Sequence, residues 1–240
     1  MTEMTAADAA EHLQVSQRQV RRLASKHVLK TTRVVGRTLL LDAASVHQLA
    51  GRVRHNGRPW SPATAWAALA LLSGQNAPWM DSAALSRLHH RLRGSRATEV
   101  AWLARGRAHV HQMQGWGRDN GLIPTGVSAL REPKLATLFD LSPAERGVDG
   151  YVAARHFDDV VTNLGLFDDI EGDVTVRVVP DDADYALDRP LIAAVAVDLS
   201  ESLDTREAAA GERVLDGLLD AFRAGESHAS GRFGEYIVGR

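Results

Sequence analysis

The sequence predicts an α+β protein with a small N-terminal domain, a mostly helical middle module and a C-terminal α/β domain with a short mixed sheet. Three observations lead to this prediction. Residues 5–51 place a β-hairpin between capped helical segments. Residues 61–104 carry apolar side chains at helical spacing, and β-prone and helical runs alternate from residue 149 onward. We place the domains at residues 1–51, 61–145 and 146–240, with a basic linker at residues 52–60.

Two short helices are predicted at the start of the chain. Thr5 and Asp8 have the spacing of a capping box, and apolar residues then repeat at helical spacing as far as Leu13. Ser16 is the expected cap of a second helix that runs to Lys26. The side chains of this helix expected to point inward are Val15, Val20, Leu23 and Ala24.

A β-hairpin and a third helix follow. Residues 32–35 and 38–41 are β-prone, and Gly36 between them permits the positive φ that a tight turn requires. Asp42 is the expected cap of a helix over residues 43–50, and Gly51 is expected to end it.

Residues 5–13, residues 15–23 and the Val35-Gly36-Arg37 turn together resemble the excisionase and MerR-like winged helix-turn-helix domains. The resemblance implies that the second helix enters a DNA major groove, with Gln17 and Arg18 nearest the base edges, and that the hairpin is a wing. The remaining cations suit phosphate. The DNA-contacting residues expected are Ser16, Gln17, Arg18, Gln19, Arg21, Arg22, Lys26, Arg33 and Arg37. The alternative is a helical hairpin with a solvated basic face.

The charges of the chain are unevenly distributed. Residues 1–120 hold 17 lysines and arginines and 7 acidic residues, a net charge of +10. Residues 121–240 hold the remaining 11 basic and 23 acidic residues, a net charge of −12. A basic first half attracts phosphate and an acidic second half is repelled by it. The second half therefore suits a protein partner or a ligand better than DNA.

Composition also bears on where the protein works. Cysteine is absent, which excludes disulfides and thiolate metal sites. The N-terminus lacks the pattern of a signal peptide, and the longest apolar run, residues 65–72, is too short to cross a bilayer. We expect a cytoplasmic protein with no membrane partner.

The middle module is predicted to begin with three helices. Ser61-Pro62 and Asp81 are the expected starts of the first two, and the third lies around residues 98–104. A strand is expected at residues 107–113, and short irregular pieces at residues 115–142.

The C-terminal domain is predicted to alternate strands and helices. We expect a strand at residues 151–153, a helix at 154–164 that Gly165 ends, and a half-buried strand at 174–179. The almost continuously apolar residues 191–199 are expected to form a strand covered on both faces. Asp204 begins a capping box and a final helix.

No catalytic residue, metal site or cofactor is predicted. His109 and His111, with His89 or His90, lack the spacing of a metal box, and no phosphate-binding glycine loop or nucleophile elbow occurs. Asp198 and Glu201 come nearest to catalytic carboxylates, but a turn before a capped helix explains them as well. Five tryptophans lie among the cations, where core filling is expected over stacking on unpaired bases.

The whole layout is similar to AbiE-like (type IV) bacterial antitoxins, through residues 58–61, 176–180, 194–199 and 206–211. That resemblance implies a transcriptional autorepressor that binds double-stranded DNA and whose C-terminal half counters a nucleotidyltransferase-like toxin. Because one winged helix makes few contacts, we expect either a homodimer on DNA or help from the basic middle module. A ligand-sensing regulator with a C-terminal effector domain is the first alternative. A nucleic-acid-processing enzyme that uses the C-terminal carboxylates is the second.

Overall fold

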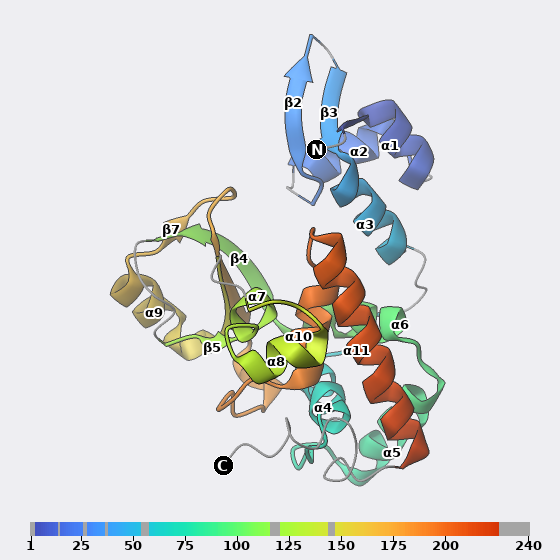
Figure 1. Ribbon diagram of the computed structural model, residues 1–240, viewed down its shortest axis with the longest axis vertical. Helices are drawn as coiled ribbons and strands as arrows, with labels where there is room; N and C mark the ends of the chain where they lie inside the picture. Colours follow the sequence, from blue (N-terminus) through green and yellow to red (C-terminus); the bar gives the residue numbers. More distant parts are fainter. Residues whose placement is uncertain are drawn as a thin grey trace. The chain divides into compact units, whose positions relative to one another are not determined.

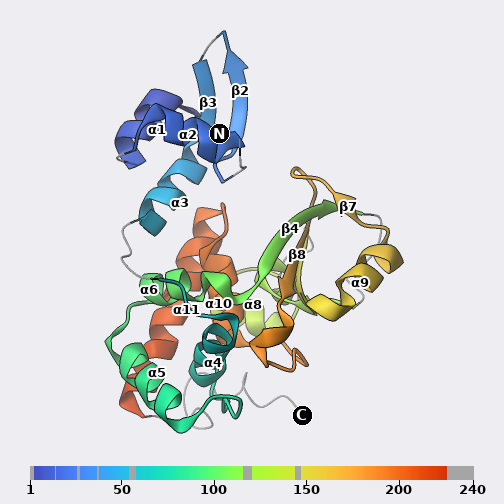
Figure 2. The same ribbon diagram turned by 180° about the vertical axis from the view of Figure 1, so that it is seen from behind.

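A computed structural model of the protein describes residues 3–13, 15–25, 28–36, 38–53, 58–115, 121–143 and 147–225. The chain divides into two compact units, Met1–Gly57 and Arg58–Arg240, which we call the N-terminal and C-terminal units. Figures 1 and 2 show the elements of each unit from opposite sides. None of the described helices has the length and apolar composition that a bilayer span requires.

The N-terminal unit combines three helices with a three-stranded antiparallel sheet of order β1-β3-β2 (Figure 1). Its elements are β1 (Glu3–Thr5), α1 (Ala6–Leu13), α2 (Gln17–Ser25), β2 (Thr31–Val35), β3 (Thr38–Asp42) and α3 (Ala43–Val53). The two predicted helices, the hairpin and the closing helix are therefore confirmed, and β1 is an addition. A small core of Ala9, Val20, Leu29, Leu41 and Val46 holds them together.

Local capping explains where these helices begin. The hydroxyl of Thr5 accepts a hydrogen bond from the backbone N–H of Asp8 (3.2 Å), as in the first half of a capping box, and donates to the Asp8 carboxylate (2.8 Å). Asp42 accepts from the N–H of Ala44 (3.3 Å). The predicted end of α3 at Gly51 is wrong, because the backbone of Gly51 stays helical and α3 continues to Val53. A glycine ends a helix reliably only where it adopts a positive φ.

The C-terminal unit contains a mixed five-stranded sheet and eight α-helices in the part of the chain that is described. The strands are β4 (His109–Gln114), β5 (Ile123–Pro124), β6 (Val148–Ala153), β7 (Phe167–Asp168) and β8 (Val174–Val179). The helices are α4 (Pro62–Leu72), α5 (Ser82–Gly94), α6 (Ala97–Leu103), α7 (Gly126–Ala129), α8 (Pro133–Phe139), α9 (Phe157–Leu164), α10 (Ile192–Ser200) and α11 (Thr205–Ala224). Short 3₁₀ turns are η1 (Ala104–Arg107), η2 (Ala154–His156) and η3 (Asp181–Ala183).

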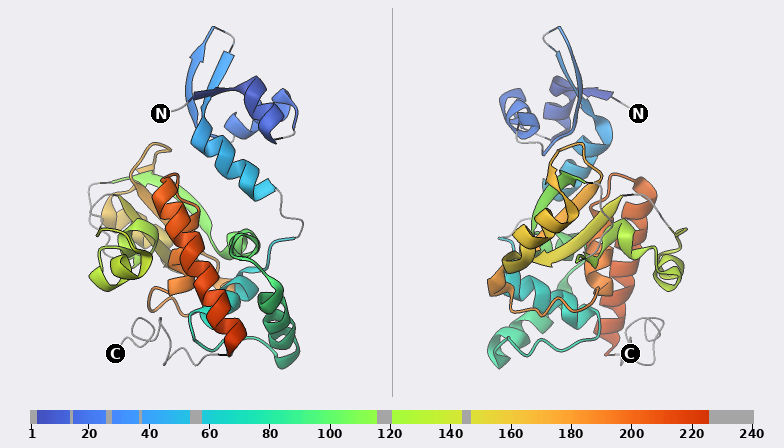
Figure 3. Two further views of the ribbon diagram at one scale, coloured as in Figure 1. Left: turned by 45° about the vertical axis from the view of Figure 1, so that its right-hand side comes forward. Right: turned by 90° about the vertical axis from the view of Figure 1, so that its left-hand side faces the viewer.

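The sheet has the order β5-β6-β8-β4-β7, with β6 and β8 parallel and the other pairs antiparallel. It is thus mixed, as predicted. Helix α9 lies on one face, and α7, α8 and α10 lie toward the other (Figures 1 and 3). Strand β8 is central and buried along almost its whole length, so the prediction of a half-buried strand is wrong. Its alternation with threonine and arginine suggested an exposed face, but Arg177 is buried among ionic partners.

The run at residues 191–199 forms helix α10, not the predicted strand. Residues Ile192 to Leu199 are all buried, so the hydropathy of the run resembles that of a strand covered on both faces. Ala193, Ala194 and Ala196 favour the helix, since alanine is the strongest helix former. Helix α10 packs directly against α11, whose predicted cap, Asp204, accepts from the N–H groups of Arg206 and Glu207.

The predicted middle module and C-terminal domain form one unit. Strands β4 and β5, from the first, join β6 and β8, from the second, in a single sheet. Helix α4, which begins at Ser61-Pro62 as predicted, lies in the same core as α10 and α11. The predicted linker at 52–60 is too long at both ends. Helix α3 extends through Val53, and the N–H of Trp60 donates to the carbonyl of Leu103 (2.9 Å) in the C-terminal unit.

Candidate nucleic-acid interface

Helix α2 is held against the N-terminal core by one side of its surface. The side chains of Val20 and Ala24 are buried, and those of Val15 and Leu23 are half-buried, as predicted. The hydroxyl of Ser16 accepts from the N–H of Gln19 (3.2 Å) and fixes the first turn. These contacts determine which side of α2 faces the solvent.

The outward side of α2 is polar and cationic. Gln17, Arg18, Arg21 and Arg22 are exposed, Ser16 is exposed beside them, and Gln19 is half-buried. The three arginines follow the i, i+3, i+4 spacing that places side chains on one helix face. The helix contains no acidic residue, and within the described ranges no ion pair engages these arginines. Their charges are therefore available to an external anion.

The hairpin of β2 and β3 presents one further cation. Gly36 turns it with a φ of +63°, and Val34 and Val35 beside the turn are exposed. Arg33 is exposed as well, but its guanidinium donates to both carboxylate oxygens of Glu3, at 3.1 and 2.9 Å. This hydrogen bonding lowers the pKa of Glu3. Lys26 and Arg37, the other expected contacts, lie outside the described residues.

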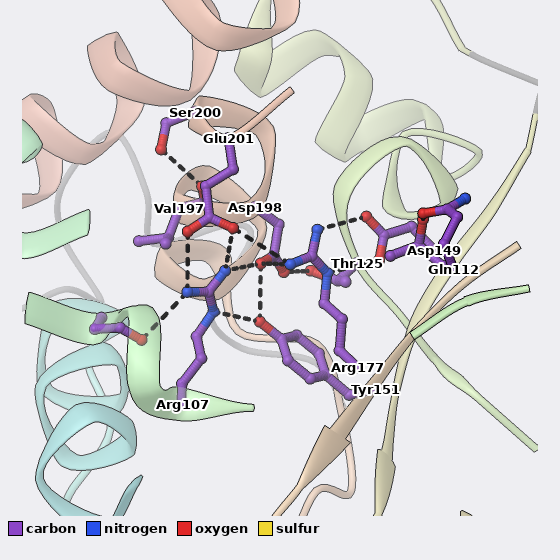
Figure 4. Close-up of polar contacts among 12 residues, drawn as sticks. Arg107, Gln112, Thr125, Asp149, Tyr151, Arg177, Val197, Asp198, Ser200 and Glu201 are labelled. Carbon is purple, nitrogen blue, oxygen red and sulfur yellow. Dashed lines mark hydrogen bonds and ion pairs between the residues drawn. The ribbon is translucent and has the colours of Figure 1, made fainter. Parts of the chain in front are cut away.

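A second cluster of charges, which the sequence prediction missed, is buried in the C-terminal unit (Figure 4). Arg107, at the end of η1, donates to Asp198 of α10, to Glu201 (3.0 Å) and to the hydroxyl of Tyr151 (2.8 Å). Burial lowers the pKa of Arg107, but the carboxylates of Asp198 and Glu201 outweigh burial and hold it well above its ordinary value. Arg107 therefore remains charged inside the protein.

A second arginine approaches the same carboxylates from β8 (Figure 4). Arg177 donates to both oxygens of Asp149, at 2.7 and 2.9 Å, and lies 3.1 Å from Asp198. Thr125 donates to the second oxygen of Asp198. Two guanidinium groups and three carboxylates are thus connected, and of these side chains Glu201 is the most exposed, at 22%.

This network changes the interpretation of Asp198 and Glu201. These two carboxylates were expected after a buried strand, either as catalytic groups or at the turn before the last helix. Asp198 instead lies within the buried helix α10, Glu201 lies in the turn after it, and both are bound by arginines. Among the described residues, no three histidine or carboxylate side chains gather as metal ligands do. One signal in the sequence does point to the network: a single carboxylate inside a long apolar run needs a buried counterion.

Two histidines and several tryptophans of the C-terminal unit pack against other side chains, whereas His90, His109 and His156 are exposed. The rings of His89 and His111 lie against phenylalanines, and Trp66 is fully buried, with its N–H donating to the carbonyl of Arg107 (3.0 Å). Trp60 and Trp79 pack against the same core, which confirms core filling for these three tryptophans. Trp102 is half-buried with Arg105 over its ring, and Trp116 lies outside the described residues.

A pocket of about 410 Å³ opens at the carboxyl end of β6. Its walls include the apolar side chains of Val160 and Leu187 and the polar side chains of Arg155, His156 and Asp159. Leu187 has a φ of +48°, a conformation that non-glycine residues seldom adopt. Ligands of α/β sheets commonly bind at the carboxyl ends of strands, so this pocket is the candidate ligand site of the C-terminal unit.

The chain matches no protein-family model, no curated protein and no solved structure. The function proposed below therefore rests on the geometry of the two units.

Proposed function

We propose that the N-terminal unit is a winged helix-turn-helix domain and that the protein is a sequence-specific DNA-binding autorepressor. The outward face of α2 carries this proposal. Helix α2 is short and capped, its underside is buried, it contains no acidic residue, and its three exposed arginines form no ion pair with any described residue; this shape and charge suit a major groove. In this proposal the hairpin of β2 and β3 is the wing.

The proposed contacts divide by their place on α2. Gln17 and Arg18 lie in its first turn, where side chains of a recognition helix reach base edges. Arg21 and Arg22, one turn later, are suited to phosphate. If the three arginines each displace about one counterion, log Kobs falls with log[salt] with a slope of about −3. One such domain covers a single half-site, so we expect a homodimer or a second surface on DNA.

A binding experiment tests this proposal. A labelled duplex from the region upstream of the protein's own gene is titrated by fluorescence anisotropy, with a random-sequence duplex as competitor. We expect Arg18→Ala combined with Arg22→Ala to weaken binding about tenfold or more, and the preference for the upstream sequence to fall.

The matched control is Arg189→Ala combined with Arg206→Ala, which removes the same charge from exposed positions of the C-terminal unit. Unchanged affinity after the α2 substitutions, or an equal loss in both double variants, would contradict binding through α2.

We further propose that the C-terminal unit binds a protein partner and that the pair is a toxin and its antitoxin, in the cytoplasm. The acidic balance of residues 121–240 supports a partner other than DNA. The test is co-expression with the product of the gene next to its own. We expect co-purification and relief of growth inhibition. Growth inhibition that the protein does not relieve, or separate elution of the two products, argues against this part.

A ligand-sensing regulator is the second candidate, and the pocket at the end of β6 favours it. Its volume lies in the range of small-molecule sites, and it combines an apolar wall with three polar side chains. In a screen of small metabolites, this candidate requires a compound that raises the melting temperature and changes DNA affinity together. It also requires that Val160→Trp, which would fill the pocket, abolish both effects.

A further inference from the structure

Glu3 and Arg33 lie on the same face of the N-terminal sheet, on either side of the central strand β3. Glu3 of β1 is directly opposite Asp42, and Arg33 of β2 is directly opposite Leu40. Opposed residues of antiparallel strands share a face, so the two long side chains meet above β3. Leu41, the residue between these two β3 positions, points to the other face and is buried in the core.

The contact between them uses the edge of the guanidinium group that binds an anion best. Nε and Nη2 of Arg33 donate to Oε1 and Oε2 of Glu3, at 3.1 and 2.9 Å. This paired geometry suits a carboxylate and a phosphate equally. The Arg33 side chain is 64% exposed and that of Glu3 is 26% exposed, so the pair lies where DNA could reach it.

We propose that Glu3 competes with DNA phosphate for Arg33, and thereby sets how many phosphates the N-terminal unit neutralises. The inference rests on the proposed DNA binding. While Glu3 holds the guanidinium, the pair has no net charge and Arg33 adds nothing to counterion release. Exposed ion pairs contribute little free energy, so the competition is balanced closely enough for one substitution to change it.

The experiment compares full-length variants by the salt dependence of binding to a random-sequence duplex. Glu3→Gln removes the competing charge from Arg33. Glu11→Gln is the control, because it removes the same charge from an exposed residue of α1. We expect Glu3→Gln to make the log–log salt slope more negative by about 0.9 for each N-terminal unit bound, which corresponds to one additional phosphate per unit. Affinity at low salt should rise about two- to fivefold, while Glu11→Gln leaves the slope unchanged.

Two further variants separate the ion pair from the net charge. Glu3→Asp keeps the charge but shortens the reach, and we expect a slope between those of wild type and Glu3→Gln. In an Arg33→Ala background, Glu3→Gln should have no effect on the slope. Thermal melts followed by circular dichroism verify that each variant is folded.

The outcomes distinguish the two proposals. Equal slopes for Glu3→Gln and Glu11→Gln, or a steeper slope that persists without Arg33, would overturn the role of Glu3 while leaving DNA binding intact. A wild-type protein that binds no duplex, or one that the α2 substitutions leave unaffected, contradicts the proposed function itself.

Discussion

Asp198 is a fully buried carboxylate, and its surroundings show what a buried charge requires. Arg107, Thr125 and Tyr151 all donate to its carboxylate, and Arg177 lies at ion-pair distance. The side chain has no exposed surface. Without these partners the ionised carboxylate would be strongly destabilised in a low-dielectric interior.

Removal of Asp198 should therefore leave two arginines with too little counter-charge. We expect Asp198→Ala to lower the free energy of unfolding of the C-terminal unit by about 3–5 kcal/mol. Urea unfolding followed by tryptophan fluorescence measures it. The control is Asp188→Ala, which breaks a 4.0 Å pair between exposed side chains and should change stability by less than about 0.5 kcal/mol. Similar losses in both variants would show that the network contributes little.

Tyr185 makes stability depend on alkaline pH. Its ring stacks on Trp66 with centroids 4.7 Å apart, and burial, aided by Asp188, raises the pKa of its hydroxyl to about 12. Its contribution is complete below the unfolded pKa of about 10 and is lost as the pH rises through 12, because only the unfolded chain ionises readily. Urea midpoints measured from pH 8 to 12 should fall less in Tyr185→Phe than in wild type. Parallel curves would contradict the shift.

At the scale of elements, α10 and α11 approach each other closely at Gly211. A Cβ atom on Gly211 of α11 would lie 2.5 Å from both the carbonyl oxygen of Ala196 and the backbone nitrogen of Ser200. Neither is the end of a flexible side chain. The absence of a side chain at position 211 thus sets the distance between the two helices.

Gly211→Ala should force these helices apart. We expect a loss of about 1–3 kcal/mol in the free energy of unfolding, as for other overpacked sites, despite the better helix propensity of alanine. Gly94→Ala is the matched control, because it is also a helical glycine but nothing lies within 4 Å of its added Cβ. That variant should be up to about 1 kcal/mol more stable. Denaturant midpoints compare the two, and a stabilised Gly211→Ala variant would contradict this packing.

Elements whose start is encoded locally were predictable from the sequence. Ser61 and Asp81 accept hydrogen bonds from N–H groups three residues later, so the starts of α4 and α5 can be recognised from a short stretch of sequence. Helix α10 and the joining of β4 to β8 were not predictable in this way. Both depend on residues distant in sequence, because an apolar run becomes a helix or a strand according to what covers it.

The candidate interface also has a part that local sequence predicts and a part that depends on distant residues. The outward face of α2 follows from helical period alone, and its exposed arginines are where the sequence predicted them. The pairing of Arg33 with Glu3 could not be predicted from a local pattern, because it depends on β1, which is only three residues long. Arg107 counted toward the basic first half, but the fold buries it against carboxylates of the acidic half.

At the scale of the whole molecule, the two units differ in their optical signals. All five tryptophans follow residue 57, so tryptophan fluorescence reports on the C-terminal unit, whereas far-ultraviolet circular dichroism reports on both. We expect the two urea transitions to differ, because the units have separate cores of different size.

Saturation with duplex DNA at about 100 times the Kd should stabilise the N-terminal unit by about 2.7 kcal/mol and leave the fluorescence midpoint unchanged. Coincident transitions that DNA shifts together would show that the units unfold as one.

The order in which the ionic network is synthesised has a consequence for the nascent chain. Arg107 leaves the ribosome before its carboxylate partners Asp198 and Glu201 do, and until α10 has emerged Arg177 can pair only with Asp149. The N-terminal unit finds all its core partners within its own residues. The N-terminal unit can therefore fold first during translation. A message truncated before codon 198 would yield a folded N-terminal unit attached to an unfolded part of the C-terminal unit.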